Sequence, residues 1–230
     1  MDILLVKNLF FGAIFLDFIL AIFSFYFSFT LLRRRNDKIA FNFGMATLCL
    51  GFWLITLAFL FLGVLPSYGT FLTNLTFIFG IGILHFFYIF TLYFPVIQVE
   101  NHKRIEYTVS LVTSFVALST LIPGLYCIST MYDRPLVYIN NNPVGLSIYT
   151  FYFALLSVLI AVNLRKSFLE SDGHYRAVIK KIGVSSMIAI IVNLILSIIV
   201  FYIWEFDTSI IGAIATSIVI YYIYSILHTK

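Results

Sequence analysis

Seven long runs of apolar residues, separated by short polar stretches, organise this chain. Each run is continuously apolar and long enough to cross a bilayer as a helix, which takes about 20 residues. Strands of a membrane barrel are about half as long and alternate in polarity, and only helices and closed barrels satisfy every backbone group in lipid. The pattern therefore predicts seven transmembrane helices, at about residues 9–32, 39–63, 71–95, 107–129, 144–164, 182–203 and 209–227.

The polar stretches between the runs contain loop and helix-start signals. A basic run at 33–38 follows the first span, and Pro66 to Gly69 follow the second. Asn142 before Pro143 is typical of a helix start, because the asparagine side chain accepts a free backbone N–H and proline has none to leave unpaired. We expect the fifth helix to begin near Val144, and the chain, residues 1–230, to form one domain.

The composition excludes a water-soluble fold. Hydrophobic residues make up 62% of the 230 residues and charged residues 10%, against about 45–50% and about 25% in soluble domains. A soluble domain of this size needs far more polar surface. The predicted fold class is an all-α, polytopic membrane protein, a seven-transmembrane-helix bundle in the cell (plasma) membrane.

The distribution of Lys and Arg predicts the orientation. These residues concentrate on the cytoplasmic side of membrane proteins, and the predicted spans place twelve of the 14 on one side. We therefore expect the N-terminus outside and the C-terminus in the cytoplasm. The cytoplasmic cations are expected to contact anionic lipid headgroups, and no nucleic acid is needed to explain them. They are Arg33, Arg34, Arg35, Lys38, Lys103, Arg104, Arg165, Lys166, Arg176, Lys180, Lys181 and Lys230.

The sequence argues against catalysis. No predicted loop is long enough for a folded domain, and the longest covers residues 165–181. There is no H-E-x-x-H motif, no G-x-S-x-G motif and no glycine-rich phosphate loop. We predict that the chain is not an enzyme, takes no cofactor or metal and does not drive primary active transport. The last span also lacks the lysine that a retinal protein needs.

Two ionisable residues fall inside predicted spans. Asp17 lies in the first span and His85 near the middle of the third. Charged groups are costly in a bilayer and are candidates for a function by default. Both residues are therefore candidates for ligand binding or proton sensing. The alternative is a structural role, in which each hydrogen-bonds to a neighbouring helix.

Amide and small residues inside the spans indicate helix packing. Such residues hydrogen-bond across helices or allow two backbones to approach closely. We interpret them as interhelical polar packing rather than as a binding site. They are Asn74, Asn163, Asn193, Gly212 and Thr216.

Three passages carry a resemblance to a known family. They are Leu-Gly-Phe-Trp-Leu with Trp53 in the second span, the close of the third span from Tyr88 to Pro95, and Asp207, Thr208 and Gly212 at the entry to the last span. In these features the chain resembles the N-terminal seven-transmembrane sensor domain of bacterial histidine kinases. The resemblance implies that the seventh helix passes a signal to a cytoplasmic output domain or partner. Kinase activity would lie in a domain or partner absent from this sequence, which is either a piece of a longer protein or a stand-alone module.

The leading functional hypothesis is a membrane sensor or receptor module for an extracellular or membrane-borne signal. We expect a small-molecule ligand in a pocket open to the outside, lined by helices one to three and seven. A small secondary transporter or channel is the alternative, and it would depend on titration of Asp17 or His85. A second alternative is a membrane scaffold subunit that needs no ligand.

Overall fold

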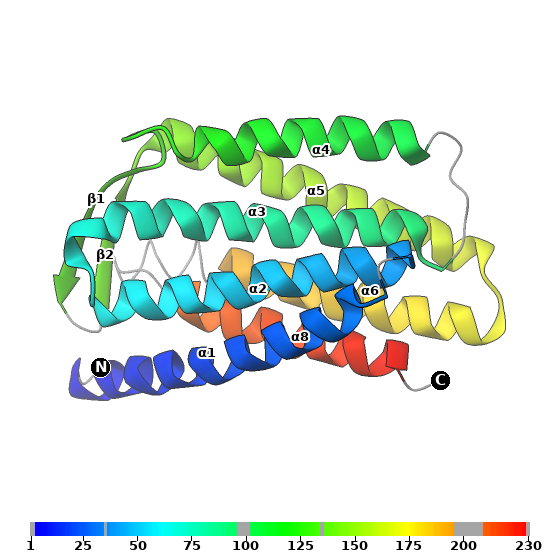
Figure 1. The fold of residues 1–230 in the computed structure, drawn as a ribbon, viewed down its shortest axis with the longest axis horizontal. Helices are drawn as coiled ribbons and strands as arrows, with labels where there is room; N and C mark the ends of the chain where they lie inside the picture. The colour runs from blue at the N-terminus through cyan, green and yellow to red at the C-terminus, as the bar shows by residue number, and fades with distance from the viewer. Residues whose placement is uncertain (1–2, 35, 96–101, 134–135, 196–208, 229–230) are drawn as a thin grey trace.

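The structure is a computed structural model that describes residues 3–34, 36–95, 102–133, 136–195 and 209–228. Seven α-helices in these ranges lie side by side, and successive helices run in opposite directions (Figure 1). A short helix, η1 (Pro66–Tyr68), precedes α3, and two strands form a hairpin, β1 (Cys127–Asp133) and β2 (Leu136–Asn141). The helices are α1 (Ile3–Leu32), α2 (Lys38–Leu62), α3 (Gly69–Tyr93), α4 (His102–Ser119), α5 (Pro143–Glu170), α6 (Gly173–Leu194) and α8 (Ser209–His228).

Five of these helices are long and apolar enough to cross a membrane: α1, α2, α3 with η1, α5 and α8. The chain is thus mostly helical and has the apolar helices of a membrane protein. Helix α4 starts with a charged run, Lys103, Arg104 and Glu106, and basic residues also occupy the first turns of α6. Membrane crossing by all seven helices, and the orientation of the N-terminus, remain predictions.

The bundle has two distinct ends. We call the end that carries β1 and β2 the hairpin end; α1, α3, α5 and α8 begin there (Figure 1). At the opposite end, which we call the basic end, Arg33, Lys38, Lys103 and Lys166 lie on helix termini. Lys7, which pairs with Asp133 of the hairpin, lies at the hairpin end, whereas Arg33, Lys38, Lys103 and Lys166 lie at the opposite end.

The fourth predicted span, 107–129, is wrong at its end. Helix α4 stops at Ser119, and the chain then turns into the antiparallel β1–β2 hairpin, in which Thr130 pairs with Ile139. Pro123 lacks the N–H that would continue the helix, and Gly124 adopts a left-handed conformation with φ of 74°. The all-α prediction therefore misses a hairpin.

The predicted loop 165–181 is also wrong, because most of it is helical. Helix α5 continues to Glu170 and α6 starts at Gly173, so only residues 171 and 172 separate them. The apolar run marks only part of each helix, and the charged turns extend beyond it. The predicted start of the fifth helix is confirmed: Asn142 caps α5 by accepting the Val144 N–H at 3.0 Å, with Pro143 in the first turn.

Helix α1 packs through one narrow stripe. Its buried residues follow one another at alternating spacings of four and three residues, the spacing of a coiled-coil seam. Glycines on α2 allow a close approach, since a Cβ on Gly51 would lie 2.9 Å from the Phe25 ring and one on Gly44 would lie 3.0 Å from Leu31 Cβ. The stripe consists of Phe10, Ile14, Asp17, Ala21, Ser24, Ser28 and Leu31.

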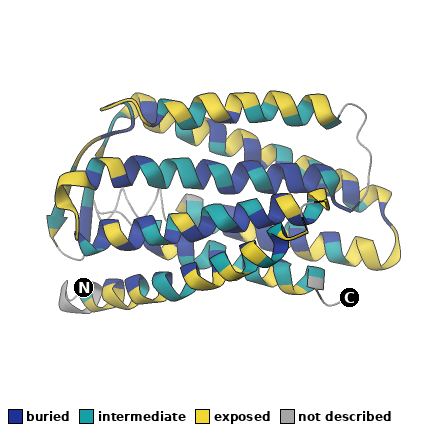
Figure 2. Cartoon of the chain, viewed as in Figure 1, coloured by how far each residue is buried: buried dark blue, intermediate teal, exposed yellow. Residues whose placement is uncertain are grey.

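Burial is greatest on α2 and α3, at the centre of the bundle, whereas α4 is largely exposed and buries only Thr113 among its own residues (Figure 2). The hairpin lies against the start of α3, where a Cβ on Gly69 would collide with Thr130 and Tyr132. An ion pair of 2.8 Å between Lys7 and Asp133 ties the hairpin to α1. The hairpin is therefore fixed across one end of the bundle.

Gly145 tests the packing between α5 and the segment before β1. A methyl group there would meet the Leu125 carbonyl and lie 2.9 Å from Tyr126 Cα, and a backbone cannot easily move away. We expect Gly145→Ala to destabilise the protein by about 1–3 kcal/mol, measured as a lower Tm in detergent. Gly183→Ala is the control, because a Cβ there meets nothing within 4 Å. Equal Tm values for the two variants would contradict this packing.

Candidate ligand-binding pocket

A pocket of about 670 Å³ lies between α3, α5, α6 and α8, with Trp53 of α2 and Ile139 of β2 at its border. Ligand pockets typically have about 300–1,000 Å³. On α3 the lining extends from Thr76 to Phe87, and on α8 from Ser209 to Ile223. The pocket therefore reaches from the hairpin end into the middle of the bundle.

Three of the lining residues are small. Gly80 of α3, Ala154 of α5 and Ala189 of α6 all line the pocket. The lining residues on α5 and α6 differ in exposure. Phe151 of α5 is 72% exposed, whereas Ala189 of α6 is buried. The pocket thus opens along α5, on the side of the bundle.

The described lining contains no charged side chain and is mostly apolar. Its polar groups include Asn193, which donates to Thr216 Oγ1 at 2.7 Å and to the Ala189 carbonyl at 2.9 Å. Thr216 in turn donates to the Gly212 carbonyl at 2.9 Å. Asn141, at the end of β2, differs from these, because its buried side-chain oxygen has no hydrogen-bond partner among the described residues. The described lining residues therefore present a mostly apolar surface.

The structure brings some of the predicted site residues together. Trp53, Asn193 and Thr216 line the pocket. The Gly212 carbonyl accepts a hydrogen bond from Thr216. This pocket differs from the expected one, which is lined by helices one to three and seven: α5 and α6 contribute to it, and no described residue of α1 does. Helix pairing depends on contacts between distant segments, which the apolar pattern does not encode. The predicted anchors Asp207 and Thr208 lie outside the described residues.

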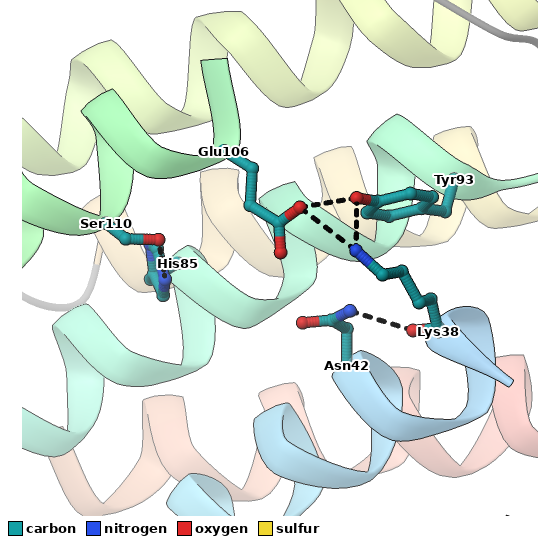
Figure 3. A network of polar contacts seen from close by, with 6 residues as sticks. All are labelled: Lys38, Asn42, His85, Tyr93, Glu106 and Ser110. Carbon is teal, nitrogen blue, oxygen red and sulfur yellow. Dashed lines mark hydrogen bonds and ion pairs between the residues drawn. The ribbon is translucent and has the colours of Figure 1, made fainter. Parts of the chain in front are cut away.

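His85 lies away from the pocket, in a hydrogen-bond network between three helices. Its Nδ1 is 2.9 Å from Thr113 Oγ1 of α4, and its Nε2 is 3.4 Å from Ser110 Oγ (Figure 3). Thr113 Oγ1 is also 2.5 Å from the Tyr152 hydroxyl of α5. A smaller space of about 300 Å³ lies beside His85, between α3 and α4. The geometry favours the structural alternative for His85, which links α3 and α5 to the exposed α4.

Asp17 lies in the buried stripe of α1, and it is fully buried. Neither carboxyl oxygen has a hydrogen-bond partner among the residues that the structure describes. Seven residues further along the stripe, Ser24 lies 2.9 Å from the hydroxyl of Tyr221 on α8, which donates to the Leu20 carbonyl at 2.5 Å. The stripe is therefore polar at the contact with α8.

The remaining predicted residues lie at helix contacts. Asn163 of α5 donates to Thr91 of α3 at 3.2 Å. Asn74 is buried on α3, and its side-chain oxygen has no partner among the described residues. Pro95 is buried just after α3, next to Phe94, whose carbonyl accepts the Ser167 hydroxyl at 3.4 Å. These residues do not converge on one site.

Sequence reasoning missed a charged cluster at the basic end. Lys38 of α2 donates to the Tyr93 hydroxyl at 2.8 Å and lies 3.4 Å from Glu106 of α4, and the Tyr93 hydroxyl also donates to Glu106 (Figure 3). The Lys38 ammonium also lies 4.6 Å from the centre of the Tyr93 ring. The cluster connects three helices, and its residues are too far apart in sequence to form a motif.

No protein-family model matches the chain, and a search of curated proteins finds no significant match. The resemblance to the sensor domain of bacterial histidine kinases therefore stays a prediction from the sequence.

Thr113→Val tests the network around His85. The change leaves the Tyr152 hydroxyl and one histidine nitrogen without this partner, so we expect a loss of about 1–2 kcal/mol and a lower Tm in detergent. Ser114→Ala is the control, since Ser114 is exposed and its hydroxyl donates only to the Ser110 carbonyl of its own helix. A Thr113→Val protein as stable as the control would show that the network contributes nothing.

Asp17→Leu tests the buried carboxyl group. A buried polar group without a partner costs about 1–3 kcal/mol, so we expect the leucine variant to have a higher Tm than the parent. Ser24→Ala, in the same stripe, removes a hydroxyl that contacts Tyr221 and should lower the Tm. A lower Tm for Asp17→Leu would show that the carboxyl group has a stabilising partner.

Proposed function

We propose that the chain is a membrane sensor or receptor module that binds a small molecule in the pocket and responds through α8. One observation carries the proposal: α8 forms a wall of the pocket and also packs on α1. Val219 and Ile220 line the pocket, while Tyr221, the next residue, contacts Ser24 and the Leu20 carbonyl. A molecule in the pocket therefore acts on a helix that has a second contact surface.

The coupling follows from differential binding. A ligand shifts a helix only if it fits one placement of that helix better than another. Shifts of about 1–2 Å at helix interfaces are a common means of signalling. The α1–α8 contact consists of the Tyr221 hydrogen bonds and of ring contacts of Phe27 with Tyr221 and Tyr224. We expect α8 to move against α1 at this contact when the pocket is filled.

The proposal includes the orientation. We place the hairpin end outside and the basic end in the cytoplasm, where Lys and Arg meet anionic headgroups. Helix α8 begins at the hairpin end and runs toward the basic end (Figure 1). A cytoplasmic signalling domain or partner would read its position there.

A proton-coupled carrier is the second candidate. The carboxyl group of Asp17 is fully buried without a described partner, and an ionisable group that destabilises a membrane helix in this way is a candidate for a function such as proton transfer. Proteoliposomes loaded with a pH-sensitive dye test it. A carrier would acidify the lumen after an outside acid pulse, and Asp17→Asn would abolish the signal. Equal signals from parent and variant would exclude a role for Asp17 in proton movement.

Val219→Trp tests whether filling the pocket moves α8. The larger side chain enters the pocket, so we expect the distance between spin labels on α1 and α8 to shift by about 1–2 Å or more. The labels replace Phe29 and Ser225, which are both exposed, in a variant whose two native cysteines are alanine. Pulsed electron spin resonance measures the distance.

Ile218→Trp is the matched control. Ile218 is the preceding residue of α8, is 61% exposed and does not line the pocket. Its distance distribution should match that of the parent. The same distribution for Val219→Trp would contradict the proposed coupling.

A further inference from the structure

Helices α5 and α6 meet in a tight turn at the basic end, because only residues 171 and 172 separate them (Figure 1). We call residues 165–181 the α5–α6 tip. The two helices are in contact there, since the Arg176 guanidinium of α6 lies 4.6 Å from the centre of the Phe168 ring of α5. Five basic residues lie on the tip, and all of them are exposed: Arg165, Lys166, Arg176, Lys180 and Lys181.

Four of these cations lie at one depth relative to the apolar runs. The predicted spans end at residue 164 on α5 and begin at residue 182 on α6, so Arg165 and Lys181 are the first residues beyond them. Lys166 and Lys180 are the second. At 1.5 Å per residue, all four positions lie within about 3 Å of the hydrocarbon edge. The headgroup layer is about 5–8 Å thick on each side of a bilayer, so the four cations lie in the layer that contains the lipid phosphates.

The acidic residues of the tip do not neutralise its cations. The Glu170 carboxylate pairs with a lysine of its own helix at 3.9 Å, and Asp172 lies in the turn. In the part of the chain that the structure describes, no ion pair involves Arg165, Lys180 or Lys181. Five cations and two carboxylates give the tip a net charge of +3. This charge exceeds that of a single lipid phosphate.

A lipid with two phosphates fits this arrangement better than a lipid with one. Each of the two neighbouring helices supplies a pair of cations at the same depth, so each pair can bind one phosphate. Basic surfaces between transmembrane helices bind anionic headgroups of this kind. In a cardiolipin the two phosphates are joined through one glycerol, so the second phosphate binds as part of the same molecule, at a high effective concentration.

We infer that the α5–α6 tip is a binding site for a lipid with two phosphate groups, of the cardiolipin class. One phosphate binds Arg165 and Lys166 of α5, and the other binds Lys180 and Lys181 of α6. The inference rests on the proposed function only in that both place the basic end of the bundle among lipid headgroups.

Native mass spectrometry of the detergent-solubilised protein tests this site, because it counts bound lipids. The probes are tetraoleoyl cardiolipin, dioleoyl phosphatidylglycerol, which has one phosphate, and inorganic pyrophosphate, which has two phosphates and no acyl chains. At equal concentrations of phosphate, we expect one cardiolipin to bind about tenfold more tightly than phosphatidylglycerol. Pyrophosphate should not compete with it.

Two double variants with the same loss of charge locate the lipid. Lys180→Gln with Lys181→Gln should weaken cardiolipin binding by about tenfold or more, because each cation near an anionic surface contributes about fivefold. Lys103→Gln with Arg104→Gln is the matched control, at exposed positions of α4 at the same end of the bundle. The control should change the affinity by less than about twofold.

The α5 half of the site has its own variant. Arg165→Gln with Lys166→Gln also changes two exposed positions, and it should weaken cardiolipin binding by about tenfold as well. An unchanged affinity would show that α5 takes no part and would overturn the two-helix site.

Four further results would overturn the inference. No bound cardiolipin would exclude the site, and equal losses in the tip variants and the α4 control would leave only a general attraction. Equal affinity for phosphatidylglycerol would remove the requirement for two phosphates. Competition by pyrophosphate would make the ligand a soluble anion. The receptor proposal would fail separately, if Val219→Trp left the α1–α8 distance unchanged.

Discussion

Backbone hydrogen bonding is the constraint on which the rest of the structure depends. In lipid every N–H and C=O must be paired within the chain, so a crossing segment is a continuous helix. The shape of the interior is then set by side-chain size where helices meet. Gly44 and Gly51 bring α1 against α2. Gly80 lets the Tyr149 hydroxyl approach α3 closely, and Gly80, Ala154 and Ala189 are among the residues that line the pocket.

The pocket and the α1 stripe meet on α8. Successive residues of one helix point in different directions, so Ile220 faces the pocket while Tyr221 reaches α1. In the proposed mechanism this helix transmits a change of shape without a charged relay. Few ionisable groups lie in the predicted spans. His85, one of them, lies in a hydrogen-bond network between helices and does not line the pocket.

The sequence predicted the elements whose signal is local. Uninterrupted apolar runs located α1, α2, α3, α5 and α8, and Asn142 with Pro143 located the start of α5. The end of α4 was missed because residues 120–129 are as apolar as the helix before them, and only Pro123 and Gly124 mark the change. The lining of this pocket by α5 and α6 was not predicted, since it depends on packing between distant segments. Asn193 and Thr216 were recognised as polar packing residues, but their position at the pocket required the fold.

The central claim is that the pocket is coupled to the α1–α8 contact, and coupling is reciprocal. The direct test is a double-mutant cycle on the free energy of unfolding in detergent, in which Ala189→Phe fills the pocket and Tyr221→Phe removes the hydroxyl at Ser24 and Leu20 but leaves the pocket lining unchanged. The cycle of Ala189→Phe with Tyr222→Phe, at an exposed neighbouring position, is the control. The account predicts a coupling energy of about 1 kcal/mol for the first pair and none for the second. Additive effects in both cycles would contradict it.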